Sequence, residues 1–331
     1  MAHGLAFAPI RTLSSVTERR DPPLGVTAVV PTLLPRSELA TVLDALGDEP
    51  LGEVIVVENG PNLELEERPG VRILRPGRNL GIAARNLAAR EAKSELLLML
   101  DDDSYPLPGA VETLVAAFER DHRLGVAGGL VRDVDPVTGA ETERGTNTFD
   151  YWLGDPTRPD DEVPSFFFPE GACMMRREAF LEAGGYFEPY IHAGAGLDLA
   201  TTLLAHGWDV RYVPAAKFVH LKAGSGRDKS AMLRARVRNQ LWYFYRHFPA
   251  SVAARRIPAY LAFDLLESVK SGSTGAWRRG IYDAWHQRAA VRGTRKPLPR
   301  ETIRRAELNR GRRHVHLLAD RIAGQLRLRK T

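Results

Sequence analysis

The sequence predicts an α/β fold, with a mostly parallel central sheet, helices on both of its faces and a C-terminal helical extension. Two observations support this fold class. Between residues 25 and 135, short runs of β-branched and aliphatic residues alternate with helical stretches across short connections, as in parallel sheets. From about residue 230 onward, the pattern becomes helical and strongly basic.

Each element follows from its own residue pattern. VTAVVP at 26–31 has the length and β-branched content of a strand, and SELATVLDALG at 37–47 has the apolar spacing of an amphipathic helix. The further expected elements are strands at 53–61, 71–75, 95–100 and 125–133, helices at 82–92, 109–120 and 197–207, a strand leading into a helix at 170–180, and short strands at 208–214 and 216–220. The segment 134–168, rich in Pro, Asp and Thr, is expected to be an insertion or a flexible connection.

The composition is that of a globular protein able to bury a sizeable core, with 44% hydrophobic and 26% charged residues in a chain of 331. Cys173 is the single cysteine, which excludes a disulfide framework and a cysteine-based zinc site and fits a reducing cytosol. The N-terminal stretch lacks the apolar core of a signal peptide, and no run approaches the roughly 18 apolar residues of a membrane span. We therefore expect a cytoplasmic location.

Charge is distributed unevenly along the chain. Residues 226–331 contain 25 Lys and Arg against 7 Asp and Glu, whereas the remaining residues are acidic overall, and the net charge is +5. Such asymmetry suggests an anionic partner or surface for the basic part. We expect a flexible N-terminal arm at 1–24, a main domain at 25–225 and a basic helical extension at 226–331.

Three aspartates follow directly after a run of large apolar residues, in LLLMLDDDSYP at 96–106. Like charges placed together repel and raise one another's pKa, a cost that a cation or a ligand carrying one relieves. Thr32, Glu58–Asn59 and Asp101–Asp103 lie at the carboxyl ends of three predicted strands, the second of which ends in a turn, and ligands of such sheets bind beyond these strand ends. We therefore expect all three to open onto one site; the alternative for the aspartates is a solvated acidic turn.

Six motifs in order carry a resemblance to a known family. They are VVPT (29–32), VIVVENG (54–60), NLGIAARNLAAREA (79–92), LDDDSYP (100–106), GACMMRREAFLEAGGY (171–186) and GWDVRYVPAAKFVH (207–220). On these motifs, residues 25–225 resemble a family 2 inverting glycosyltransferase with the GT-A fold, the nucleotide-diphospho-sugar transferase fold, of the rhamnosyltransferase-like kind. The resemblance covers about two thirds of the chain.

The resemblance implies transfer of a hexosyl-type sugar from a nucleotide-diphosphate donor to an acceptor hydroxyl, assisted by Mn²⁺ or Mg²⁺. Hard cations of this kind favour carboxylate and phosphate oxygens. The resemblance implies that Asp103 and His220 bind the metal and that Asp101 lies near the ribose. Asp101 and Asp103 are expected on the same side of an extended backbone, so the expected metal ligands are Asp101, Asp103 and His220. The resemblance implies that Glu58 contacts the base and that Arg85 contacts the base or a phosphate. The nucleotide-binding residues it implies are Pro31, Thr32, Glu58, Arg85, Asp101 and Asp102.

The sequence departs from the family pattern where a general base is expected. Inverting transfer needs a group that takes the acceptor hydroxyl proton, and the family places acids at the start of the helix that precedes GW. Here these acids are replaced by Ala195 and Gly196, and only Asp198 remains. Asp198 is therefore the nominal catalytic residue; His192 or Glu170 are alternatives, or the acceptor needs no strong base.

Two rival functions remain open from the sequence. A degenerate GT-A domain would bind a nucleotide or a partner without efficient transfer. A nucleotidyltransferase would share the sheet but would show a Gly-rich phosphate loop after the first strand, where this chain has TLLPRSE. Donor hydrolysis distinguishes the enzyme from the binding protein, and pyrophosphate release identifies the nucleotidyltransferase.

The basic extension interleaves arginines with aromatic residues in RARVRNQLWYFYRHFP at 234–249. Such a helix suits an anionic membrane surface at the inner face of the membrane, an acceptor groove, or packing of its aromatic side on the main domain. The acceptor is a small molecule, a glycan or a lipid-linked molecule. No nucleic-acid module is recognised, and the sequence leaves the oligomeric state open.

Overall fold

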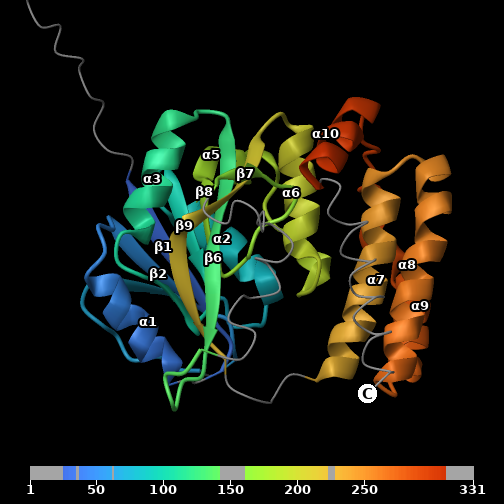
Figure 1. The fold of residues 1–331 in the computed structure, drawn as a ribbon. Coiled ribbons are helices and arrows are strands. Elements are labelled where there is room, and N and C mark those ends of the chain that lie inside the picture. The colour runs from blue at the N-terminus through green and yellow to red at the C-terminus, as the bar shows by residue number, and fades with distance from the viewer. Residues whose placement is uncertain (1–24, 35–36, 62, 142–160, 223–227, 311–331) are drawn as a thin grey trace, which may run out of the picture.

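The computed structural model describes residues 25–34, 37–61, 63–141, 161–222 and 228–310. In this part, a nine-stranded sheet lies between two layers of helices, with further helices beside it (Figure 1). The strands are β1 (Val26–Thr32), β2 (Glu53–Glu58), β3 (Val71–Leu74), β4 (Leu96–Leu100), β5 (Ser104–Pro106), β6 (Leu124–Val134), β7 (Val163–Pro164), β8 (Ala172–Arg176) and β9 (Asp209–Leu221). The helices are α1 (Glu38–Gly47), α2 (Ala84–Glu91), α3 (Ala110–Arg120), α5 (Arg177–Glu182), α6 (Ala195–Ala205), α7 (Lys229–His247), α8 (Ala250–Lys270), α9 (Thr274–His286) and α10 (Arg300–Arg310).

The sheet is mixed. Its order is β3-β2-β1-β4-β8-β6-β9-β5, with β7 paired to β9. The β3-β2-β1-β4 half is parallel, as the strand–helix alternation predicts. Beyond it, β8 runs antiparallel to both β4 and β6. The α/β fold with helices on both faces is thus confirmed, and β8 divides the sheet where the functional residues gather.

Alternation along the strands divides the core into two layers. In β4, Leu97 and Met99 face the layer that contains residues of α2, α5 and α6, whereas Leu96, Leu98 and Leu100 face the layer of α1 and α3. The whole strand is buried, because both of its faces are covered. An apolar run of this kind is what a strand inside a two-sided sheet requires.

Besides β7, which lies within the predicted insertion at 134–168, two elements differ from the sequence prediction. Residues 209–221 form one long strand, β9, instead of two short ones, because the pairing with β6 shifts register between Gly129 and Leu130 and continues past Pro214. The short strand β5, which the sequence did not predict, follows the aspartates and pairs antiparallel with β9. This pairing sets Ser104 opposite His220 and so connects the aspartate segment to the end of β9.

The C-terminal helices pack on the main domain and on one another. In α7 the aromatic residues are largely buried, and Trp242 belongs to the same core layer as α6. Its arginines pair with other helices: Arg234 with Asp283 of α9 and Arg236 with Asp264 of α8. Of the three roles considered for this segment, packing on the main domain is the one observed. None of the helices described here has the length and apolar character to cross a membrane.

The predicted N-terminal arm at 1–24 and residues 142–160 of the predicted insertion lie outside the described residues. Around that gap, β6 extends to Val134 and forms an isolated bridge to Glu141. After it, β7 pairs with β9. The described flanks of 134–168 are therefore attached to the sheet.

Candidate active site

A pocket with a volume of about 770 Å³ lies at the carboxyl ends of β1 and β4. Pro31, Asp101 and Asp102 line it from the parallel half of the sheet. Glu170, just before β8, and the loop 191–194, just before α6, line it as well. This is the edge at which the sequence predicted a ligand site.

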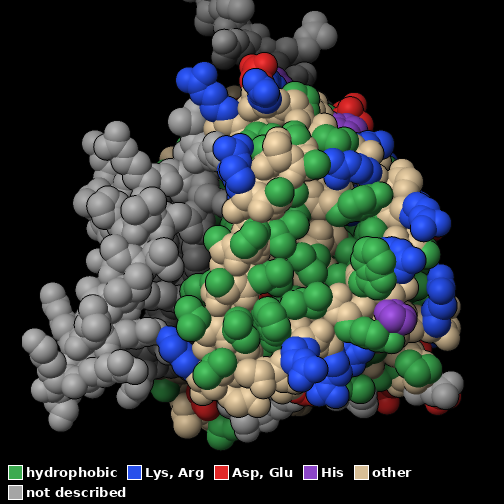
Figure 2. All heavy atoms as spheres, turned by 90° about the vertical axis from the view of Figure 1, so that its right-hand side faces the viewer, with side chains coloured by type: hydrophobic (Ala, Val, Ile, Leu, Met, Phe, Trp, Pro, Cys, Tyr) green, Lys and Arg blue, Asp and Glu red, His purple; other side chains and the backbone are tan. Residues whose placement is uncertain are grey.

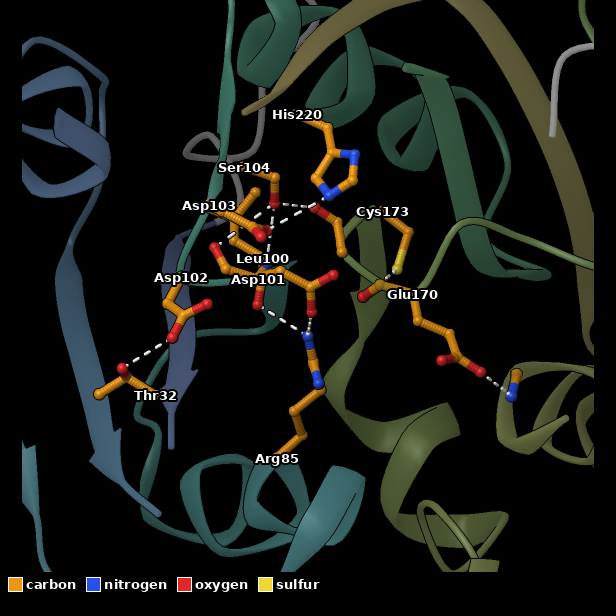
Figure 3. A network of polar contacts seen from close by, with 12 residues as sticks. Thr32, Arg85, Leu100, Asp101, Asp102, Asp103, Ser104, Glu170, Cys173 and His220 are labelled. Atoms are coloured by element: carbon orange, nitrogen blue, oxygen red, sulfur yellow. Dashed lines mark hydrogen bonds and ion pairs between the residues drawn. The ribbon is translucent and has the colours of Figure 1, made fainter. Parts of the chain in front are cut away.

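The three aspartates lie on a tight turn between β4 and β5. The Ser104 backbone N–H donates to the Asp101 carbonyl at 3.2 Å, and the Ser104 hydroxyl accepts from the Asp101 N–H at 2.9 Å. The expectation of an extended backbone is therefore wrong here, and the three carboxylates point toward different partners (Figure 3). Each aspartate contacts a different element of the fold.

Asp101 is held by a buried arginine of α2. Nη2 of Arg85 donates to Oδ1 of Asp101 at 2.6 Å and to the carbonyl of Leu100 at 2.7 Å. Arg85 is 3% exposed, but it lines the pocket together with Asp101. On the other side of the carboxylate lies Gly171, where an added Cβ would collide with Oδ2 of Asp101. The site thus holds the guanidinium of Arg85 and the carboxylate of Asp101 in fixed positions.

Asp102 connects the turn to β1. The hydroxyl of Thr32 donates to Oδ2 of Asp102 at 2.7 Å, and the carbonyl of Thr32 accepts the backbone N–H of Asn59 at 2.7 Å. Thr32 is buried, whereas Asp102 and Pro31 line the pocket. The structure therefore brings Thr32 and Asp102 together, as the sequence predicted.

Asp103 and His220 meet at the other end of the turn. Oδ1 of Asp103 lies 3.5 Å from Nε2 of His220, and Nδ1 of His220 lies 2.8 Å from Oδ1 of Asp133 in β6. Oδ2 of Asp133 accepts from Lys222 at 2.8 Å. Burial lowers the pKa of His220, but the neighbouring carboxylates outweigh burial and raise it overall.

The side chains of Asp103 and His220 provide part of the ligand set that a hard divalent cation needs. The described residues contain no group of three His, Cys, Asp or Glu side chains arranged to hold a metal ion. Asp103 and His220 supply one carboxylate and one imidazole, and the other imidazole nitrogen is fixed by Asp133, which is the usual outer arrangement of a metal-binding histidine. Two protein donors completed by phosphate oxygens match the way Mg²⁺ is commonly bound. Asp101 instead pairs with Arg85.

Glu58 fixes a loop beside the pocket. Its carboxylate accepts the backbone N–H groups of Glu64 and Leu65 at 3.2 and 3.1 Å, and it pairs with Arg75 at 3.2 Å. Its neighbour Asn59 lines the pocket. The predicted base contact of Glu58 is untested by these interactions, which hold the segment after β2 in place.

Asp198 lies in a buried polar cluster between α6 and α7. It is 2% exposed, pairs with Arg246 and accepts from Nε2 of His247 at 2.8 Å and from the hydroxyl of Tyr190 at 3.1 Å. Burial raises its pKa, but His247 and Arg246 outweigh burial and lower it overall. A carboxylate that donors occupy and whose pKa is lowered is a weak base. Asp198 does not line the pocket.

Glu170 and His192, the alternatives to Asp198, both line the pocket. Burial raises the pKa of Glu170 to about 7, against the opposing effects of Arg85 and of the Gly196 N–H. Burial and the charge of Arg238 lower the pKa of His192. Of the three carboxylate and imidazole candidates, Asp198 is thus the one placed away from the pocket.

Sequence reasoning missed Asn239, which positions the pocket loop. From α7, its side-chain amide donates to the carbonyls of His192 and Ala193 at 2.6 and 2.7 Å, and it lies 3.1 Å from the carbonyl of Tyr190. Ile191 and Ala193 in this loop have positive φ angles of 52° and 58°, which are uncommon for residues other than glycine. No local pattern in the sequence marks Asn239, because its partners lie more than 40 residues away.

Residues 27–184 match the sequence model of the family described as glycosyl transferase family 2. This segment is a family 2 glycosyltransferase domain. It contains Arg85, Glu170 and the turn formed by Asp101–Asp103, which we call the aspartate turn. His220 and Asp198 lie beyond this segment. The family 2 resemblance carried by the six motifs is thereby confirmed for this segment.

Two relatives of this chain come from Mycobacterium tuberculosis (strain CDC 1551 / Oshkosh). An N-acetylglucosaminyl-diphospho-decaprenol L-rhamnosyltransferase is 28% identical over 247 residues, which cover 64% of this chain and 80% of the relative. A pre-mycofactocin glycosyltransferase is 28% identical over 224 residues, which cover 63% of this chain and 46% of the relative. The likeness extends to a rhamnosyltransferase, as the sequence predicted.

A solved structure confirms the GT-A fold. GalNAc-T7, crystallised with UDP, GalNAc and Mn²⁺, superposes with a TM-score of 0.56 at 18% identity. The match covers 67% of this chain and 50% of the GalNAc-T7 chain, so this chain spans about half the length of that protein. At this identity, the likeness concerns the fold alone.

Proposed function

We propose that this chain is a metal-dependent, inverting glycosyltransferase that moves a hexosyl-type sugar from a nucleotide-diphosphate donor to an acceptor hydroxyl. The observation that carries the proposal is the pocket itself, in which the aspartate turn, Arg85 and His220 meet at the carboxyl ends of the parallel strands. This arrangement combines the fixed carboxylates of the aspartate turn with the buried, positively charged side chain of Arg85. A nucleoside diphosphate and a divalent cation need both kinds of group.

In the proposed complex, the nucleoside lies near β1 and β2. Pro31 and Asn59 line this side of the pocket, and Asp102 is held there by Thr32. Arg85 lies beneath Asp101, where its charge favours a bound phosphate. The predicted contact between Glu58 and the base requires Glu58 to exchange its bonds to Glu64 and Leu65.

Asp103 and His220 would hold the divalent cation, Mn²⁺ or Mg²⁺, and Asp133 would orient the imidazole. Such a cation neutralises the negative charge that develops on the leaving diphosphate. The protein contributes a fixed pair of donors before any ligand arrives. Asp101 acts in this proposal as the partner of Arg85 and as a ribose contact.

Ligand-dependent thermal unfolding tests the donor and the metal together. Wild-type protein is measured with UDP, TDP, GDP, CDP and ADP, with and without Mn²⁺, and a ligand at about 100 times its dissociation constant adds roughly 2.7 kcal/mol. We expect stabilisation by one nucleotide that requires Mn²⁺, loss of it in Asp103→Asn, and retention in the surface control Asp44→Asn. Stabilisation without Mn²⁺ contradicts the metal assignment, and no stabilisation by any nucleotide contradicts the donor assignment.

Transfer itself is tested with the sugar donors of the nucleotide so found. Release of the nucleoside diphosphate marks a working enzyme, and NMR of the anomeric centre of the product tests inversion. Binding without release of the sugar would favour the degenerate GT-A domain. Pyrophosphate release would indicate a nucleotidyltransferase.

For the acceptor we propose a lipid-linked molecule that the protein meets at an anionic membrane surface. One of the two relatives acts, by its name, on a decaprenol-linked diphospho-sugar. Figure 2 shows a face of the molecule at the C-terminal helices where hydrophobic side chains gather and Lys and Arg side chains surround them. We call this the α8–α9 face; the exposed large apolar residues of these two helices are Leu265, Leu266, Val269, Tyr282 and Trp285.

The chemistry of the α8–α9 face matches a bilayer of anionic lipid. Val269 and Trp285 are 60% and 67% exposed, and exposed apolar and aromatic groups of this size suit the boundary between headgroups and acyl chains. Lys270 and Arg278 are exposed on the same two helices, and basic residues near an anionic surface contribute about 1 kcal/mol each. The proposed location is thus the surface of a membrane on its cytoplasmic side.

A further inference from the structure

The proposed transfer needs a group that takes a proton from the acceptor hydroxyl, and the residue marked by sequence does not occupy the pocket. Asp198 is buried between α6 and α7, where Arg246 and His247 bind both of its oxygens. At the start of the same helix stand Ala195 and Gly196, neither of which can accept a proton. The pocket must therefore obtain its base from another element.

Glu170 enters the pocket from the segment before β8. It lines the pocket together with Asp101 and Arg85, and Figure 3 shows its side chain extending to the start of α6. Its Oε1 accepts the backbone N–H of Gly196, the second residue of that helix. This is the one hydrogen bond of the Glu170 carboxylate within the described part of the chain.

The Glu170 carboxylate fits against the start of α6 because Gly196 has no side chain. A Cβ placed on Gly196 would lie 2.7 Å from Oε1 and 2.9 Å from Cγ of Glu170. Real Cβ atoms do not approach so closely, so any larger residue at 196 would displace the Glu170 side chain. Glu170 thus fills the volume that a side chain at the start of α6 would otherwise occupy.

The surroundings suit proton transfer at neutral pH. Burial raises the pKa of Glu170 to about 7, and a base works best when its pKa lies near the working pH. Two charged groups act on its pKa: Arg85 of α2 lowers it and Asp101 raises it. Glu170 in turn raises the pKa of Cys173 in β8 and of Tyr186 in the segment after α5. The N–H of Gly196 orients the carboxylate without neutralising it.

We propose that Glu170 is the general base of this glycosyltransferase and that Gly196 is the positioning residue that makes room for it. The inference rests on the proposed function. A carboxylate oxygen of Glu170 takes the acceptor hydroxyl proton while the acceptor oxygen forms its bond to the anomeric carbon. The bond from that carbon to the diphosphate breaks, the nucleoside diphosphate leaves with the electron pair, and Glu170 later releases the proton to water.

The first test replaces the carboxylate with an amide of the same shape. Glu170→Gln is compared with wild type and with Glu178→Gln, an exposed glutamate eight residues away on α5. Donors are UDP-glucose, UDP-N-acetylglucosamine, TDP-rhamnose and GDP-mannose, and the released nucleoside diphosphate is measured. We expect Glu170→Gln to keep nucleotide-dependent stabilisation and to lose about 10²–10⁴-fold in turnover, with Glu178→Gln unchanged. Equal turnover of Glu170→Gln and wild type would overturn the assignment.

The second test uses the space at Gly196. In the wild-type background, Gly196→Asp forces a new Cβ against Glu170 and should lower turnover. In the Glu170→Ala background, the same substitution places a carboxylate at the start of α6 and should raise turnover. A purely structural role of Glu170 predicts the same sign in both backgrounds, and that result would count against the proposal.

Two measurements separate this inference from the proposed function. If wild type binds none of the nucleotides, the proposed function fails and the base assignment fails with it. If it binds but turns over none of the four donors, ¹³C NMR of glutamate-labelled protein decides the inference. A carboxyl resonance that titrates near pH 7 and disappears in Glu170→Gln supports it, and a Glu170 resonance that titrates near pH 4 overturns it.

Discussion

Asp198 of α6 and Arg246 of α7 form a buried ion pair in which the carboxylate is 3% and the guanidinium 13% exposed. The guanidinium also stacks 3.7 Å from the ring centre of Phe187, so it is held from two sides. The pair joins α6, which follows the segment matched to the family 2 model, to α7 of the basic extension. It therefore ties the first residues after the pocket loop to α7.

We expect Asp198→Asn to destabilise the protein without removing the catalytic base. Removing one partner of a buried pair typically costs about 3–5 kcal/mol, because the other charge stays buried and uncompensated. The measurement is urea unfolding at pH 7. The control is Asp44→Asn, whose pair with Arg68 is exposed and should change stability by less than about 1 kcal/mol. Loss of turnover at full stability would instead return the catalytic role to Asp198.

The same residue predicts a pH dependence of stability. His247 and Arg246 lower the pKa of Asp198 against the effect of burial, so its contribution is present above its ordinary pKa and is lost as pH falls through the lowered value. Wild type should therefore lose stability more steeply than Asp198→Asn as the medium becomes strongly acidic. Parallel acid-unfolding curves for the two proteins would contradict this account.

Asn239 should affect the pocket as well as stability. Asn239→Ala removes the donors that hold the carbonyls of His192 and Ala193, and buried acceptors left unpaired cost about 1–3 kcal/mol. The loop, which has positive φ angles at Ile191 and Ala193, should then relax away from its present conformation. We expect lower stability together with a raised KM for donor or acceptor.

The matched control for Asn239 is Asn86 in α2. Asn86 is also a buried asparagine that bonds the backbone, here the N–H and carbonyl of Tyr186, and it does not line the pocket. Asn86→Ala should lower stability and leave KM near the wild-type value. If both variants raise KM equally, the effect of Asn239 is general destabilisation and its positioning role is wrong.

The parallel half of the fold and the position of the site can be predicted from the sequence, because both depend on local residue patterns. An apolar run such as Leu96–Leu100 needs cover on both faces, and a polar segment at its end then lies at the edge of the sheet. The conformation of Asp101–Asp103 was not predictable in the same way. It depends on Ser104 and on the pairing of β5 with β9, which lies more than 100 residues away in the chain.

The base assignment shows the same limit. Asp198 resembles a family acid in sequence, but its role depends on Arg246 and His247, which only the packing of α7 brings near. Glu170 and Gly196 are ordinary residues separately. Their relation exists only because the segment before β8 meets the first turn of α6.

We expect the ion pair between Asp101 and Arg85 to require a glycine at position 171. A Cβ at this position collides with the Asp101 carboxylate, so Gly171→Ala should displace Asp101 from Arg85. We expect metal-dependent nucleotide binding to weaken by at least tenfold, which corresponds to about 1.4 kcal/mol, while the protein stays folded. Gly47→Ala, where an added Cβ meets nothing within 4 Å, is the control and should bind as wild type. Unchanged binding by Gly171→Ala would show that the position of Asp101 is unimportant for the donor.

The α8–α9 face should bind anionic vesicles. Wild type is sedimented with vesicles of phosphatidylglycerol and of phosphatidylcholine, and we expect binding to the anionic vesicles that weakens as salt is raised. Leu266→Glu and Trp285→Glu place a carboxylate among the exposed apolar groups of this face, so they should reduce vesicle binding at an unchanged unfolding temperature. Val137→Glu makes the same change at a residue that is 91% exposed beside β6, and it should bind like wild type. Equal binding by all three variants would show that the α8–α9 face does not contact the lipid. Equal binding of wild type to both kinds of vesicle would show that Lys270, Arg278 and the other basic residues around this face do not contribute.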